Sequence, residues 1–117
     1  MKTQITARGF ELNAEFNRYI RHKLAELNRR LPRGVRAEIP CVLTLTQKHR
    51  KDGEAKTCAI VLRLPNETLK AQETTQHMYA ALDIVVESMG VQVHEYKVRN
   101  RRRGIRGRLS GRPAADE

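Results

Sequence analysis

Histidine, serine and carboxylate side chains are the ones in this sequence whose types could support catalysis. The histidines share no metal-ligand spacing, and neither serine lies in a nucleophile-elbow context. Asp83 and Glu87 are four residues apart, which places both on one face of a helix, where such a pair is ordinarily solvated. No glycine-rich phosphate loop or dinucleotide-binding pattern opens a helix. The residues therefore indicate a protein that is not an enzyme and that uses neither a cofactor nor a metal ion.

The two cysteines, Cys41 and Cys58, both lie within apolar segments that look like strands. A buried, reduced pair of thiols is the favoured interpretation of such residues in a cytosolic protein. Two alternatives stay open, a disulfide between them and a metal site that includes His49. Neither alternative is supported by a CxxC motif or by paired histidines.

Positive charge is the strongest chemical signal in the chain. Lys and Arg number 23 against 13 Asp and Glu, which gives a net charge of +10. Residues 97–117 hold eight basic and two acidic groups and so carry more than half of the excess. Such a field attracts polyanions, and contacts with phosphates release counterions. Because the chain has only two Phe, three Tyr and no Trp, we expect recognition of the shape and backbone of structured RNA rather than base stacking.

Apolar residues that recur at steps of three and four predict two amphipathic helices. The first begins after a candidate N-cap at Asn13 and is stopped by Pro32, and its apolar stripe is Phe16, Ile20, Leu24, Leu27 and Leu31. The last helix follows a candidate cap at Thr75, and its stripe is Met78, Leu82, Val85, Met89, Val93 and Tyr96. Gly90 interrupts this helix, which predicts a bend or a close packing contact there. We expect about one more helical turn beyond Lys97.

Period-two alternation predicts four strands, at residues 2–8, 36–47, 55–64 and 67–73. Pro40 suggests that pairing is incomplete near the start of the second strand, and the more polar fourth strand belongs at a sheet edge. Residues 48–54 are expected to form a polar turn. The order β-α-β-β-β-α predicts an α+β fold in which both helices pack on one face of a four-stranded, mainly antiparallel sheet.

The length of the chain predicts one domain, at residues 1–101, followed by a basic and disordered tail at residues 102–117. The opening residues lack the apolar stretch of a signal peptide, and no run approaches the roughly 20 apolar residues of a membrane helix. We therefore expect a cytoplasmic protein that does not enter a membrane and that is a monomer.

The candidate RNA-binding residues are cations on the two helices and just beyond the second one. Those on the first helix are Arg18, Arg21, Lys23, Arg29 and Arg30. Those at the end of the last helix are Lys97, Arg99, Arg101, Arg102 and Arg103. Further cations that we do not assign to this site surround the expected turn, namely Lys48, Arg50, Lys51 and Lys56. Any one of these side chains is ordinarily a solvated surface residue, so the prediction depends on their number.

The segment HMYAALD at residues 77–83, followed by Met89, Gln92, Val93, Tyr96 and Lys97, resembles the last helix of the ribosome hibernation factors. That family comprises the hibernation-promoting factor and protein Y group and is also called the sigma-54 modulation family. The first helix agrees through Tyr19-Ile20, Lys23-Leu24 and Leu27, and so does the opening segment from Ile5 to Gly9. The resemblance covers about residues 1–101. His77 replaces the usual Asp, and the chain is similar to the short members, without a second domain.

The resemblance implies a protein that binds the small ribosomal subunit in its mRNA and tRNA channel and silences idle ribosomes under stress or in stationary phase. The positions that match family contacts to rRNA are Lys23, Lys97, Arg99 and Arg101. The other candidate cations follow from charge alone. The alternative functions are a general binder of structured RNA, such as a ribosome assembly factor, and a protein-interaction module.

Overall fold

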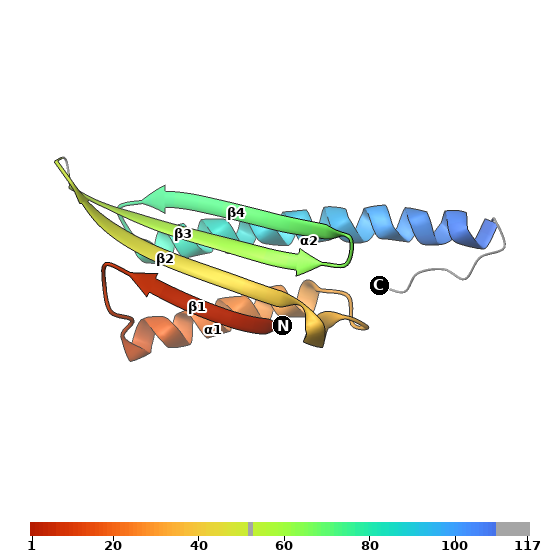
Figure 1. Cartoon of the computed structure of the whole chain (residues 1–117), viewed down its shortest axis with the longest axis horizontal. Helices are drawn as coiled ribbons and strands as arrows, with labels where there is room; N and C mark the ends of the chain where they lie inside the picture. Colours follow the sequence, from red (N-terminus) through yellow and green to blue (C-terminus); the bar gives the residue numbers. More distant parts are fainter. Residues whose placement is uncertain (52, 110–117) are drawn as a thin grey trace.

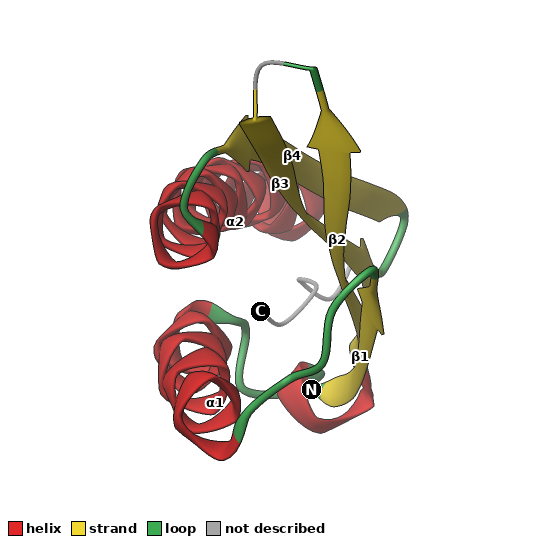
Figure 2. Cartoon of the chain, turned by 90° about the vertical axis from the view of Figure 1, so that its left-hand side faces the viewer, coloured by secondary structure: helices red, strands yellow, loops and turns green. Residues whose placement is uncertain are grey.

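The computed structural model describes the backbone of residues 1–51 and 53–109, and the side chains of that part as far as Arg101. The elements in chain order are β1 (Lys2–Arg8), α1 (Ala14–Arg30), a 3₁₀ turn (Arg36–Glu38), β2 (Pro40–Arg50), β3 (Gly53–Leu64), β4 (Glu67–Thr75) and α2 (Met78–Leu109). Both helices lie on the same face of the sheet (Figures 1 and 2). The predicted α+β fold is confirmed.

The four strands form one mixed sheet in the order β1-β2-β3-β4. β1 runs parallel to β2, with α1 as the crossover, while β2, β3 and β4 pair as antiparallel hairpins. β4 lies at an edge, as predicted. The pairing of β2 with β3 begins only at Cys41, so Pro40, which has no N–H to donate, lies outside that ladder.

The core fills the space between the helices and the sheet, and both predicted apolar stripes are buried in it. The sheet contributes the alternating residues Cys41, Leu43, Leu45, Cys58, Ile60, Leu62, Leu64, Leu69 and Ala71. Cys41 and Cys58 are both free thiols. Their burial raises the pKa of Cys41 to about 11 and that of Cys58 to about 12. The buried, reduced interpretation is confirmed, and the disulfide alternative is wrong.

The second helix continues farther than the sequence predicted. We expected it to end about one turn after Lys97, but α2 runs to Leu109 and includes residues 102–109 of the expected tail. Arginine is among the better helix formers, so residues 101–103 favour continuation of the helix, whereas each of the two following glycines costs about 1 kcal/mol relative to alanine. Residues 110–117 lie outside the described part of the chain.

Other boundaries also differ from prediction, and residues 36–38 of the expected second strand form the 3₁₀ turn, so that β2 begins only at Pro40. The expected polar turn at residues 48–54 is largely strand, because β2 and β3 keep pairing as far as Arg50 and Gly53. Thr75 ends β4 rather than capping α2 directly, although its hydroxyl accepts a hydrogen bond from the His77 N–H. By contrast, Asn13 caps α1 as predicted, and its side chain accepts from the Phe16 N–H at 2.7 Å.

Candidate nucleic-acid interface

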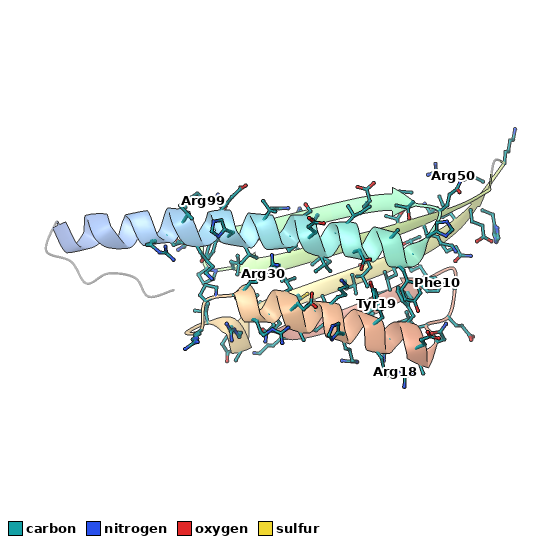
Figure 3. All side chains as sticks on the ribbon, turned by 180° about the vertical axis from the view of Figure 1, so that it is seen from behind. Phe10, Arg18, Tyr19, Arg30, Arg50 and Arg99 are labelled. Atoms are coloured by element: carbon teal, nitrogen blue, oxygen red, sulfur yellow. The ribbon has the colours of Figure 1, made fainter. Side chains whose placement is uncertain are left out.

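α1 and α2 form the two walls of a groove on the surface away from the sheet. One hollow of about 420 Å³ is lined by Lys23, Glu26, Leu27, Arg30, Asp83, Val86 and Glu87. A second, of about 450 Å³, is lined by Arg30, Gly90, Val91, Val93, His94 and Lys97. We call the residues of these two hollows the interhelical groove. Arg30 borders both hollows and lies between the helices in Figure 3. Carboxylates line the first hollow beside the cations, so the groove is of mixed sign.

At one end of the groove Lys23 is held by groups from both helices. Its ammonium lies 3.5 Å from the Asp83 carboxylate and 5.5 Å from the centre of the Tyr19 ring. The Tyr19 hydroxyl donates to Asp83 at 2.5 Å. The nearby Asp83 charge raises the pKa of Lys23, which therefore stays protonated. Asp83 is thus a link between the helices, and the expectation that Asp83 and Glu87 form a simply solvated pair is wrong for Asp83.

An aromatic cluster lies beside this ion pair. The Tyr79 ring contacts Phe16 and Tyr19, with ring centres 4.7 and 4.8 Å apart and the planes tilted. The hydrogen bond to Asp83 is the main cause of a raised pKa at Tyr19. These contacts join the first two turns of α1 and α2 and so fix how far apart the walls of the groove stand.

In the middle of the groove the Arg30 side chain crosses α2 directly above Gly90. A Cβ atom placed at residue 90 would lie 2.3 Å from Nη1 of Arg30. The close packing contact that the sequence predicted at Gly90 is therefore confirmed, and the partner in that contact is a candidate RNA-binding cation. Without a side chain at residue 90, the guanidinium group can lie between the helices (Figure 3).

At the far end of the groove, cations satisfy the last carbonyl groups of α1. Lys97 Nζ donates to the Arg30 carbonyl at 2.9 Å. The Arg36 guanidinium donates to the carbonyls of Arg29 and Leu31 at 2.9 and 2.8 Å. The carbonyl groups at a helix C-terminus have no partner within the helix and carry partial negative charge, so both cations stabilise α1 there. Lys97 therefore also joins α2 to the end of α1.

The structure separates the three candidate cations at residues 97, 99 and 101. Arg99 turns toward the sheet edge, where its guanidinium donates to the Glu67 carboxylate at 2.5 Å, and this hydrogen bond raises the pKa of Arg99. Arg101 is exposed and follows Lys97 by four residues, so these two share a helix face. Arg102 and Arg103 continue α2, and their side chains lie outside the described part.

The cations of α1 also divide among several sides of the helix. Lys23 and Arg30, seven residues apart, face α2 in the interhelical groove. Arg18 points away from α2 in Figure 3, and Arg29 lies three turns farther along the same exposed side. Arg21 borders a separate hollow on the β1 side, lined also by Met1, Thr3, Leu24, Ala25 and Asn28. The five candidate cations of the first helix therefore lie on three different sides of it.

Comparison with known proteins identifies the family. Residues 3–101 match the family model described as sigma 54 modulation protein / S30EA ribosomal protein. The chain belongs to this family. Over its whole length it is 26% identical to a ribosome hibernation promotion factor from Lactococcus lactis subsp. cremoris (strain MG1363), and it spans 60% of the length of that relative.

Two solved structures resemble this member of the sigma 54 modulation family in fold. A ribosomal subunit interface protein from Coxiella burnetii matches with a TM-score of 0.66 at 24% identity, covering 84% of this chain and 99% of that one. The N-terminal domain of Thermus thermophilus protein Y matches with a TM-score of 0.67 at 21% identity, covering 82% and 99%. Neither helix in the described part of this chain has an apolar stretch long enough to cross a membrane.

Sequence reasoning missed the partners that position the cations. Tyr19 and Lys23 are four residues apart on α1, a spacing that could have indicated their contact. The links to Asp83 and Glu67 join residues more than 30 positions apart and need the fold to be known. In the described part, no group of three or more His, Cys, Asp or Glu side chains is arranged to hold a metal ion.

Proposed function

We propose that this protein is a non-enzymatic ribosome hibernation factor, which binds rRNA of the small subunit in the mRNA and tRNA channel and blocks translation by occupying that space. The observation that carries the proposal is the family match over residues 3–101. The names of two similar proteins, a ribosome hibernation promotion factor and a ribosomal subunit interface protein, support a ribosomal partner. The protein acts as a cytoplasmic monomer under stress or in stationary phase.

The chemistry of the surface supports phosphate contacts around the interhelical groove rather than at its floor. The carboxylates of Glu26, Asp83 and Glu87 repel a phosphate that approaches the first hollow. Among the described side chains, Arg18, Arg21, Arg29 and Arg101 have no ion-pair partner, and their charges remain available to phosphates. The proposed contact residues are Arg18, Arg21, Lys23, Arg29, Arg30, Lys97, Arg99, Arg101, Arg102 and Arg103.

The steric part of the proposal fits the elongated domain. Its principal extents are 60 × 26 × 17 Å, and an elongated body of this kind suits a channel better than a flat surface. No reaction is required, because occupation by itself excludes the competing ligands. Binding therefore depends on surface charge and shape, and the inhibitory effect follows from affinity alone.

Co-sedimentation with purified ribosomal subunits tests this function. We expect the protein to move with small subunits at low salt, to leave them as salt rises, and to be displaced by initiator tRNA in the presence of mRNA. A protein that stays at the top of the gradient with small subunits contradicts the proposal. Co-sedimentation without competition by tRNA indicates an assembly factor instead. The double variant Arg63→Ala with Lys70→Ala removes two exposed cations from the strands. It is the net-charge control for variants that remove candidate RNA-binding cations.

A further inference from the structure

The β2–β3 hairpin extends beyond the rest of the sheet as a two-stranded ribbon. The last pair between β1 and β2 is Arg8 with Thr46, and the last between β3 and β4 is Lys56 with Thr75. The β2–β3 ladder continues past both limits to the pair of Arg50 with Gly53. We call residues 48–51 and 53–55 the ribbon. Figure 1 shows it at the opposite end of the molecule from the C-terminal end of α2.

Three exposed cations lie close together on the ribbon. Lys48 and Arg50 alternate along β2 and so point to the same side, and Lys51 follows at the turn. None of the three has an ion-pair partner among the residues whose side chains are described. The ribbon's Glu54 instead interacts with Gln47, His49 and Lys56, at 2.9, 3.5 and 4.0 Å. The charge of the three cations is therefore available to an external partner.

The base of the ribbon is supported by the turn between β1 and α1. Gly9 has a φ of +86°, and a Cβ atom there would lie 2.2 Å from the Gln47 carbonyl oxygen, so only glycine fits against the base of the ribbon. An isolated two-stranded ribbon is only marginally stable in water. The projecting segment buries no core residue, and three neighbouring cations repel one another. The rest of the fold therefore holds the ribbon in place, although the ribbon adds nothing to the hydrophobic core.

The composition of the ribbon decides which kind of partner it suits. Its described residues are Lys48, His49, Arg50, Lys51, Gly53, Glu54 and Ala55, without an aromatic or large aliphatic side chain. A protein interface or a membrane surface is ordinarily bound through such apolar anchors. Phosphates need only cations held at suitable positions, and a narrow β-ribbon can follow a nucleic-acid groove.

We propose that the ribbon is a second RNA-binding element, which contacts the phosphate backbone of folded rRNA separately from the helices. This inference rests on the proposed function and adds a second point of attachment to it. One contact lies at the ribbon and the other around the interhelical groove and the end of α2. Two linked contacts raise the overall affinity because the second forms within an already bound complex.

The experiment measures the affinity for purified small subunits as a function of KCl concentration. The test variant combines Lys48→Ala, Arg50→Ala and Lys51→Ala, and the charge-matched control combines Arg33→Ala, Arg63→Ala and Lys70→Ala, all at exposed positions. Losing three phosphate contacts lowers the magnitude of the slope of log K against log salt by about 2–3. We expect this decrease in the test variant, an unchanged slope in the control, and a retained slope when the same three residues are exchanged between Lys and Arg.

The outcomes separate the ribbon from the function as a whole. A test variant with the wild-type slope, in a protein that binds small subunits, overturns the ribbon proposal and leaves the proposed function standing. A wild-type protein that does not bind small subunits overturns both. An equal decrease in the control shows a general effect of net charge and also overturns the ribbon proposal. Loss of binding to phosphatidylglycerol vesicles, with subunit binding unchanged, assigns the ribbon to membranes instead and contradicts the proposal.

Discussion

Lys23, Arg30 and Lys97 in the interhelical groove each contact another part of the protein, whereas Lys48 and Arg50 on the ribbon are exposed without an ion pair in the described part. A cation held by its neighbours loses little rotamer freedom when it binds a phosphate, but a carboxylate partner such as Asp83 offsets its charge. A free cation keeps its full charge and loses more entropy on binding. The groove is therefore suited to fixing orientation, and the ribbon to adding salt-sensitive affinity.

The largest expected effect concerns the core beneath both regions. Leu82 is fully buried between α2 and the sheet, and Leu82→Ala should lower the free energy of unfolding by about 2–5 kcal/mol. Urea denaturation followed by circular dichroism measures this change. In the molecules that stay folded, the groove and the ribbon should each contribute to small-subunit affinity as they do in the wild type. A loss below about 1 kcal/mol would mean that the core around Leu82 is not packed as described.

The next prediction compares Arg99, which has a carboxylate partner, with two cations of α2 that have none in the described part. The double variant Lys97→Ala with Arg101→Ala should lower the magnitude of the salt slope for small-subunit binding by about 2. Arg99→Ala should change it much less, because Glu67 already pairs with that guanidinium. The Arg63→Ala with Lys70→Ala variant is the matched control. Equal effects of Arg99→Ala and Arg101→Ala per residue would show that pairing within the protein does not decide which cations bind.

Gly90→Ala should stabilise the fold and weaken binding at the same time. Alanine is favoured over glycine in a helix by about 1 kcal/mol, and the three atoms nearest to its Cβ all belong to the flexible side chain of Arg30. Arg30 must then leave its place in the groove. Thermal melting and subunit affinity measure the two effects. In an Arg30→Ala background, Gly90→Ala should no longer alter affinity, and a persistent loss there would contradict the role given to the contact.

The smallest effect tests the link at Asp83. Asp83→Asn removes the carboxylate that raises the pKa of Tyr19, so this pKa should fall toward its ordinary value of about 10. Because the raised pKa favours the protonated phenol in the folded state, the link stabilises the protein below about pH 10, and this contribution is lost as pH rises further. Ultraviolet titration of the tyrosines measures the shift. Lys23 should then bind phosphate slightly better, and an unchanged titration would exclude the hydrogen bond.

Periodicity predicted the elements well because burial imposes it directly. Apolar residues recur at helical spacing from Phe16 to Leu31 and from Met78 to Tyr96, and the residues of these two stripes are buried. The ends of elements were predicted less well. The sequence around Arg50 and Gly53 is typical of a turn, but these two residues pair with each other in the β2–β3 ladder, and the register of that ladder depends on both strands. The charge pattern located the candidate cations on the helices, but a count of charges does not show which way each side chain points. Only the packing of α1 against α2 distinguishes Lys23 from Arg18.

The buried thiols have a practical consequence for studies of this domain. The thiolate is the species that reacts with oxidants and alkylating reagents, and a pKa of about 11 leaves roughly one Cys41 in ten thousand ionised at pH 7, with fewer still at Cys58. Both sulfurs are also shielded by the sheet and the helices. A single cysteine introduced on the surface would therefore carry a fluorophore or spin label selectively, with the native residues left in place.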